Sequence, residues 1–137
     1  LDPSAYYLAQ REGDPGEEGT KKFFLKFLEQ HRAMVRTIVD EIRPDYLTLF
    51  TEPGTQAENT GLPFTARNVQ LGKTNYWVLL QHTLQDLDRK QTKLGAGIGT
   101  WESLELLSEA SDLPIDYLEF HVYPVQLDLF DRVSRIA

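Results

Sequence analysis

The first residue that could do chemistry is a carboxylate directly after a short apolar run. Residues 47–50 read Leu-Thr-Leu-Phe and are followed by Thr51, Glu52 and a Pro-Gly pair. Functional groups of α/β proteins gather at the carboxyl ends of parallel strands. A glutamate there can act as a general acid if burial raises its pKa, or as a metal ligand if other carboxylates join it. A solvated glutamate that opens a turn has the same local sequence and is the commoner case.

A second polar strand end lies at residues 121–124, which read His-Val-Tyr-Pro. His121 and Tyr123 are two residues apart, so they share one face of a strand. Together they suit hydrogen bonding to a hydroxyl-rich ligand or to a carboxylate, and a histidine satisfied within the core is an equally good interpretation. Trp101 ends a third candidate strand and offers an apolar stacking face, although tryptophan more often serves ordinary packing.

Other chemistries lack their patterns. The run Gly-Ala-Gly-Ile-Gly at 95–99 has no third glycine at the dinucleotide spacing, where Thr100 or Glu102 stands instead, and a charged run precedes it. Small residues that leave room for a ligand beside an inward-facing strand explain it better. The three histidines fall on separate elements, and the sequence has no Gly-x-Ser-x-Gly elbow. We therefore expect no metal, no cofactor and no serine triad.

The elements that position these residues alternate between helices and strands. Apolar periodicity predicts helices over residues 20–42, 65–90, 102–110 and 126–137, and strands over 45–50, 93–101 and 115–124. Residues 1–19 are expected to be irregular and residues 52–63 to form a loop. Ile42 and Val69 are expected on the buried stripes of the first two helices. The alternation predicts an α/β fold with parallel strands, and the first strand is apolar enough to be covered on both faces.

Composition narrows the partners. The chain has 137 residues, enough for one domain with a core, and 14 basic against 21 acidic residues give a net charge of −7. This balance argues against nucleic acid as a partner. No apolar run is long enough to span a bilayer, so no membrane partner is expected, and the absence of cysteine excludes disulfides and thiolate sites. Three strands suit either a small α/β sandwich or an arc of a (β/α)8 barrel, which typically takes ~250 residues.

Three segments together resemble a known family. "IRPDYLTLFTEP", "GAGIGTW" and "IDYLEFHVYP" are similar, in this order, to strands four, five and six of the (β/α)8 retaining glycosidases of clan A, the cellulase, mannanase and galactanase group. The similarity covers residues 20–137. It implies that residues 1–137 are one segment of a barrel and part of a longer chain, with residues 1–19 irregular and 20–137 built of βα units.

The resemblance also implies roles. Glu52 would be the acid/base of a retaining mechanism on a β-linked poly- or oligosaccharide, ~5–5.5 Å from a nucleophilic carboxylate. Thr51, which stands where that group has an asparagine contacting the sugar 2-hydroxyl, would bind substrate together with Trp101, His121 and Tyr123. The nucleophile would follow strand seven, outside this chain. The chain alone is therefore expected to be inactive, with carbohydrate and the remainder of its own barrel as partners.

Two alternatives stay open. A non-catalytic carbohydrate-binding or structural barrel relative would keep the cleft without the chemistry, and the replacement at Thr51 favours it. The presence of Glu52, His121 and Tyr123 favours the enzyme. A small α/β protein in which these strand ends carry no function is the third reading.

Overall fold

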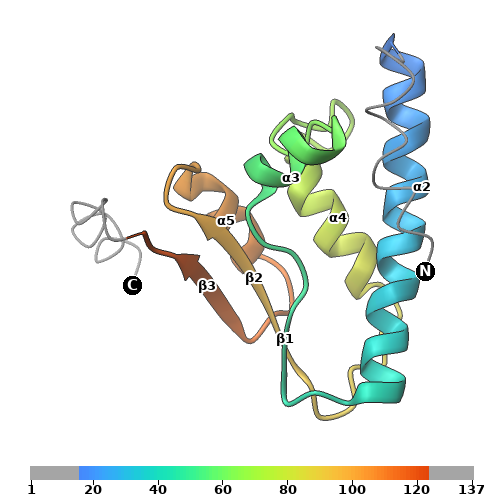
Figure 1. Ribbon diagram of the computed structural model, residues 1–137, viewed down its shortest axis with the longest axis vertical. Helices are drawn as coiled ribbons and strands as arrows, with labels where there is room; N and C mark the ends of the chain where they lie inside the picture. The colour runs from blue at the N-terminus through green and yellow to red at the C-terminus, as the bar shows by residue number, and fades with distance from the viewer. Residues whose placement is uncertain (1–15, 124–137) are drawn as a thin grey trace.

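The computed structural model describes residues 16–123 (Figure 1). The helix expected over 126–137 and residues 1–15 of the expected irregular segment lie outside the described residues. In chain order the elements are helix α2 (Gly16–Thr37), π-helix η1 (Ile38–Ile42), strand β1 (Tyr46–Thr48), helix α3 (Pro53–Thr60), helix α4 (Asn75–Leu84), strand β2 (Lys93–Gly99), helix α5 (Leu104–Ser111) and strand β3 (Tyr117–His121). The described chain is therefore α/β, as the alternation predicts.

The first helix begins earlier than expected. It starts at Gly16, so residues 16–19 are helical rather than irregular. Glu17 and Glu18 stand in its first turn, where carboxylates interact favourably with the positive end of the helix dipole. Thr20, where the helix was expected to begin, lies inside it, and its hydroxyl donates to the Gly16 carbonyl at 2.8 Å.

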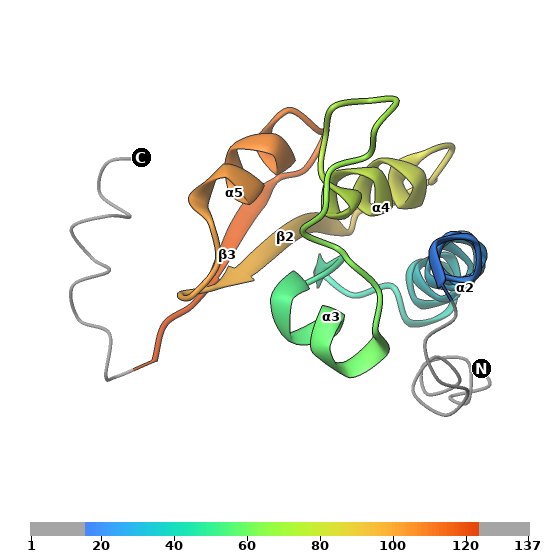
Figure 2. The ribbon, with the colours of Figure 1, turned by 90° about the horizontal axis from the view of Figure 1, so that it is seen from above.

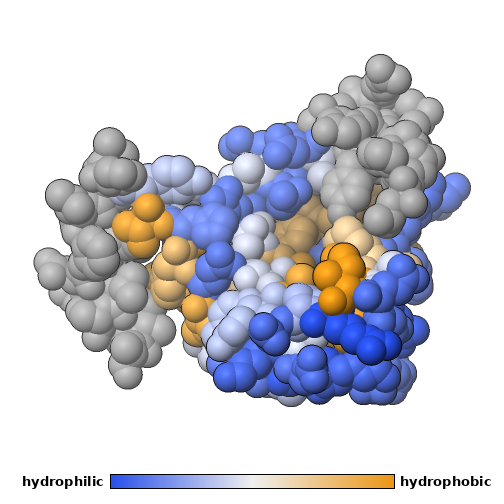
Figure 3. Space-filling model, turned by 60° about the horizontal axis from the view of Figure 1, so that its bottom comes forward, coloured by the Kyte–Doolittle hydropathy of each residue, from blue (hydrophilic) through white to orange (hydrophobic). Residues whose placement is uncertain are grey.

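The end of this helical run follows the prediction, but its last turn is irregular. Residue Arg43 closes it in the left-handed conformation, directly before Pro44, and the preceding turn is the π-helix. The wider π turn departs from the 3.6-residue period. Ile42, expected on the buried stripe, is accordingly 70% exposed. The lower end of the molecule is mainly hydrophilic, with its apolar side chains in small separate groups (Figure 3).

The three strands form one parallel sheet in the order β1-β2-β3. The register pairs Thr48 with Gly95 on one side of β2, and Gly99 with His121 on the other. Strand β2, whose sequence is mostly small residues, is thus the central strand. Because all three strands are parallel, the residues that follow β1 and β3 reach the same edge of the sheet.

One face of the sheet carries the core. Leu94, Ala96 and Ile98 of β2 are buried on the side covered by α4 and α5, with α2 beyond α4 (Figure 2). The other face is more open than expected for a strand covered on both sides, since Tyr46 of β1 is 63% exposed. A hydrogen bond between the Thr48 and Tyr117 hydroxyls, 2.9 Å long, joins β1 to β3 across this open face.

The glycines of β2 do not leave room for a ligand, contrary to the expectation from their size. A side chain at Gly95 would collide with the Tyr117 ring, and one at Gly99 would collide with the Trp101 ring. A side chain at Gly97 would meet Glu119 and Thr51. The small residues are therefore needed because neighbouring side chains of the same chain cross over them.

The second predicted helix is shorter than expected. Its ordered part is α4, and Thr74 caps it by accepting a hydrogen bond from the Trp77 N–H. Residues 65–73 instead form an irregular excursion in which the Asn68 side chain accepts the N–H groups of Gln70 and Leu71, a local bond that competes with helix formation. Val69, expected to be buried, is 99% exposed. Residues 85–90 also lie outside the helix.

The segment expected to be a loop contains a helix. Residues 53–60 form α3, which begins with Pro53 at a position where proline's fixed backbone angle suits the first turn. Gly61 ends it in the left-handed conformation, donating its N–H to the Ala57 carbonyl. None of the helices within residues 16–123 is long and apolar enough to cross a bilayer.

A bulge ends the pairing of β1 with β2. The Lys93 N–H donates to the Asp45 carbonyl, so the register would pair the Gly97 N–H with the Leu49 carbonyl. Instead it donates to the Phe50 carbonyl at 3.0 Å, which inserts one extra residue into β1. Such bulges re-aim the side chains that follow them. Here Phe50 joins the helix-side core, where its ring packs against those of Phe27 and Phe64.

His31 satisfies the carbonyl that the bulge leaves unpaired. Its Nε2–H donates to the Leu49 oxygen at 2.8 Å, and its Nδ1 lies 3.0 Å from the Thr83 hydroxyl of α4. Burial lowers the pKa of this ring to about 4, so it is neutral near pH 7. With the single ring proton on Nε2, Nδ1 is an acceptor, and it shares the one Thr83 hydroxyl proton with the Leu79 carbonyl, which lies 2.8 Å from the Thr83 oxygen. The histidine on the predicted stripe thus joins α2, α4 and the end of β1.

The His31→Leu variant should have a free energy of unfolding about 2 kcal/mol lower at pH 7, because a buried carbonyl loses its donor.

A second prediction concerns pH. The free energy of unfolding of the wild-type protein should fall by about 3 kcal/mol between pH 6.5 and pH 4, because the unfolded chain protonates His31 near pH 6.5 and the native chain only near pH 4. Urea unfolding across this range measures both. His82→Gln, at a half-buried ring paired with Glu29, should retain the slope. If the free energy of unfolding of His31→Leu depended on pH as steeply as that of the wild type, His31 would not be the source of this dependence.

Candidate active site at the carboxyl ends of the strands

Glu52 follows the bulge and immediately precedes α3. Its backbone is left-handed, with φ 48° and ψ 61°, a conformation uncommon for a residue other than glycine. Its side chain is only 15% exposed. A non-glycine residue in this region persists only where its surroundings hold it, and such residues cluster at functional sites.

Two side chains from the end of β3 meet on one oxygen of Glu52. The His121 Nδ1–H donates to Oε1 at 2.6 Å, and the Tyr123 hydroxyl donates to the same oxygen at 3.1 Å. Since a carboxylate only accepts, Nδ1 must carry a proton. The two strand ends that the sequence singled out are therefore in direct contact, although β2 separates their strands.

These contacts keep Glu52 ionised. Burial acts to raise its pKa, but hydrogen bonds from His121, Tyr123 and Thr55 outweigh burial, so the pKa lies below its ordinary value. From the sequence, we expected Glu52 to act as a general acid only if burial raised its pKa, and the pKa is instead lowered. Within residues 16–123 Glu52 is thus arranged as an ionised carboxylate that accepts hydrogen bonds, and a proton-donating role requires a further negative charge nearby to raise its pKa.

His121 lies between two carboxylates. Its Nε2 is 3.2 Å from Oε1 of Glu119, on the same face of β3, while Nδ1 binds Glu52. The hydrogen bond to Glu52 is the largest of the effects that raise the pKa of His121 above 6.5, and Glu119 adds to it. When both carboxylates are ionised, both ring nitrogens donate, and the ring is an imidazolium.

The two remaining predicted residues lie beside this cluster. The Trp101 ring packs against the Tyr123 ring, with centroids 5.1 Å apart, and is 48% exposed, so part of its apolar surface is open to a ligand. Thr51 is half-buried against Gly97 of the central strand, on the open face of the sheet. All five residues predicted for the site therefore lie at one edge of the sheet.

Sequence reasoning missed Glu102. This carboxylate is buried at the end of β2 and accepts two backbone hydrogen bonds, from the Gly54 N–H in the first turn of α3 and from the Gly99 N–H at 2.5 Å. Burial raises its pKa, and the charge of Glu52 raises it further. Glu102 ties the start of α3, two residues after Glu52, to the central strand. The available signal was a second glutamate directly after the Trp101 strand end.

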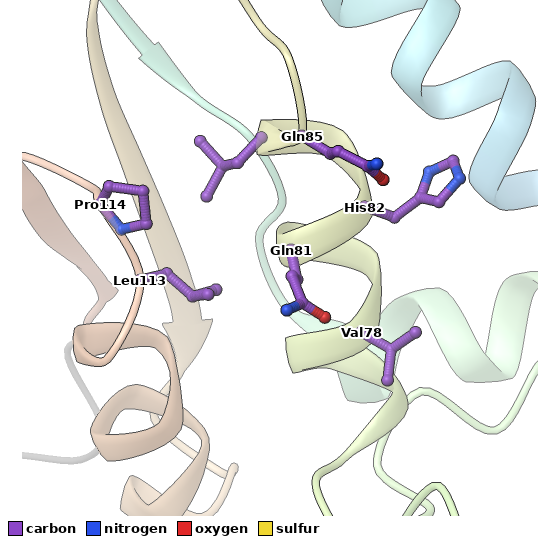
Figure 4. Close-up of a pocket in the computed structure, with 7 residues that line it drawn as sticks. Val78, Gln81, His82, Gln85, Leu113 and Pro114 are labelled. Atoms are coloured by element: carbon purple, nitrogen blue, oxygen red, sulfur yellow. The ribbon is translucent and has the colours of Figure 1, made fainter. Parts of the chain in front are cut away.

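A hollow lies beside α4, at the end of the helical layer that is far from Glu52. It encloses about 560 Å³ between α4 and the turn before β3, and Figure 4 shows Gln81, His82 and Gln85 on one side and Leu113 and Pro114 on the other. Pro114 precedes β3, whereas Glu52 follows β1, so this hollow is at the other end of the strands. Within residues 16–123 no group of three or more histidine or acidic side chains is placed to hold a metal ion.

Comparisons with known protein families, with characterised proteins and with solved structures found no match to this chain.

The His121 ring should titrate above pH 6.5, and Glu52→Gln should lower its pKa, because the strongest raising contact then becomes an amide. Two-dimensional NMR of the ring carbons measures this, with His31 and His82 as internal references.

The ion pair between Glu52 and His121 should stabilise the fold most between the lowered pKa of Glu52 and the raised pKa of His121. Its contribution fades below that window as Glu52 protonates and above it as His121 loses its proton. A His121 pKa indifferent to Glu52→Gln would contradict the contact.

Glu102→Gln should lower the free energy of unfolding by about 1–3 kcal/mol, because one of the two backbone N–H groups then faces an amide NH₂ instead of an acceptor. Urea denaturation measures the change, and hydrogen exchange at Gly54 should accelerate as α3 loosens. Glu41→Gln, at an exposed position on η1, is the matched control and should stay within about 0.5 kcal/mol of wild type. Equal stability of the two variants would remove the assigned role of Glu102.

Proposed function

We propose that this chain supplies the acid/base half of the active site of a retaining glycoside hydrolase acting on a β-linked poly- or oligosaccharide. The observation that carries the proposal is the convergence on Glu52. A single carboxylate at the end of β1 accepts hydrogen bonds from His121 and Tyr123 of β3, beside the half-exposed ring of Trp101. An ionisable carboxylate next to an apolar stacking surface and a phenol hydroxyl supplies one of the two carboxylates that glycosidic bond cleavage uses, together with a surface on which a sugar ring can stack.

The lowered pKa of Glu52 gives the proposal a specific requirement. A general acid must hold a proton in the first step, and hydrogen bonds to the carboxylate oppose this. A nucleophilic carboxylate ~5–5.5 Å away, as in retaining enzymes, raises the pKa of its neighbour by like-charge repulsion. In the proposal this nucleophile lies outside the chain. After it has bonded to the sugar its charge is gone, the pKa of Glu52 falls again, and Glu52 can take the proton of the attacking water.

The same proposal makes the sheet an arc of a (β/α)8 barrel. In support, the strands are parallel, helices lie on the side of the buried β2 residues, and the opposite face carries half-buried polar groups such as Thr48, Tyr117 and Glu119. In a barrel that face points inward and the strand ends form the floor of the active site. The remainder of the barrel is then the structural partner of this chain.

A second candidate is a non-catalytic carbohydrate-binding relative. The lowered pKa of Glu52 supports it, because an ionised carboxylate held by two donors can bind sugar hydroxyls without transferring a proton. In that case Glu52 would contribute to affinity and the protein would show no turnover.

In the natural full-length protein, Glu52→Gln should reduce kcat for unactivated β-glycosides by about 10²–10⁴-fold, because the leaving oxygen loses its proton donor. Aryl glycosides with acidic leaving groups should lose much less in the bond-breaking step, since they need little protonation. Steady-state kinetics on both substrate types measures the difference.

Glu29→Gln, which removes an equivalent charge from an exposed position on α2, is the control and should keep wild-type activity. Unchanged turnover in Glu52→Gln would reject the acid/base role. A wild-type protein that binds oligosaccharides but hydrolyses none would favour the binding candidate.

A further inference from the structure

A small hollow opens directly beside the Glu52 cluster. Its volume is about 300 Å³, and its lining includes Gly54 of α3, Trp101 and Glu102. Gly54 lies two residues after Glu52, and the Trp101 ring packs on Tyr123, which donates to Glu52. The hollow is therefore continuous with the site through residues already in contact with it. Its volume is at the lower end for ligand pockets, which fits one sugar ring better than a larger group.

The lining of the hollow is cross-linked by ion pairs and carries more acidic than basic side chains. Arg67 crosses from the excursion before α4 to α5, where its guanidinium pairs with Glu105 and, at 2.9 Å, with Glu109. It also donates to the Gly72 carbonyl at 2.6 Å. The one cationic side chain of the lining is thus already paired with two carboxylates, and Glu102 adds a further carboxylate to the lining.

The remaining lining suits a neutral polyol. Trp101, which is 48% exposed, is one of the lining residues, and Thr65 and Ser103 add hydroxyl-bearing side chains to the lining. A pyranose has an apolar C–H face that stacks on an indole and hydroxyls that bond to such groups. An anionic ligand would meet the carboxylates of Glu102 and Glu105 without a free cation to offset them.

We propose that this hollow binds one neutral sugar unit of the substrate, stacked on Trp101, and discriminates against uronic acid units at that position. This rests on the proposed function, which it deepens by naming the substrate class. Arg67 acts here as a wall of the site rather than as an anion receptor, because Glu105 and Glu109 occupy its guanidinium.

Binding to the 137-residue chain tests the inference. The probes are tetrasaccharides of β-linked glucose, mannose, galactose and xylose, together with the glucuronate and mannuronate tetrasaccharides of matching linkage. The two tryptophans, Trp77 and Trp101, give separate indole N–H signals in NMR spectra. At least one neutral tetrasaccharide should shift the Trp101 signal and spare Trp77, and its matched uronate should bind about tenfold more weakly or worse at low salt.

Variants test whether the binding occurs at Trp101. Trp101→Ala should abolish the binding, whereas Tyr46→Ala, an exposed aromatic at the opposite end of β1, should retain it. Glu105→Gln should narrow the difference in affinity between neutral and uronate probes, because it removes one negative charge and leaves Arg67 paired with Glu109 alone. Three results would overturn the inference: no neutral probe shifts Trp101 at millimolar concentration, a saturating probe leaves Trp101 unshifted, or the uronate binds as tightly as its neutral match.

The outcome is separable from that of the proposed function. If neutral probes shift Trp101 but the full-length protein hydrolyses no glycoside, the inference stands and the enzyme proposal fails. If the full-length protein hydrolyses β-glycosides and Trp101→Ala changes neither KM nor kcat, the enzyme proposal stands and the inference fails.

Discussion

The candidate site depends on one extra residue in the first strand. The bulge at Leu49 and Phe50 sends Phe50 into the aromatic core and places Thr51 and Glu52 beyond the central strand. It also leaves the Leu49 carbonyl without a strand partner, which would be costly in a buried position. The neutral His31 ring supplies the missing donor from the first helix. The edge of the sheet that carries the candidate site is therefore held by a hydrogen bond from the helical layer, and not by the sheet alone.

From that point the site is fixed on two further sides. His121 and Tyr123 reach the Glu52 carboxylate from the third strand, and Glu102 holds the start of the following helix from the second. Each strand thus contributes one restraint on the same few residues. Glu52 keeps a left-handed backbone because the chain before and after it is held independently, which is how local strain persists in a folded protein.

The alternation of helices and strands, and the meeting of Glu52 with His121 and Tyr123, could be predicted because parallel strands share their carboxyl edge. The bulge could not, since it depends on His31, eighteen residues upstream of Leu49 in sequence. Helix α3 could not either: its residues Pro-Gly-Thr-Gln-Ala-Glu-Asn-Thr include weak helix formers, and the tertiary contact from Glu102 overrides that propensity. The expectation that the β2 glycines leave room for a ligand was wrong, because the rings of Tyr117 and Trp101, which lie outside β2, cover Gly95 and Gly99.

The position of Tyr123 has one more consequence. Its ring lies on Trp101 while its hydroxyl donates to Glu52, so one phenol belongs to both the stacking surface and the charged cluster. A ligand that draws this phenol away from Glu52 removes one of the hydrogen bonds that lower the carboxylate's pKa. By thermodynamic reciprocity, the proton on Glu52 then changes the affinity at Trp101 by the same factor. Ligand occupancy at Trp101 and protonation of Glu52 are thereby two coupled equilibria.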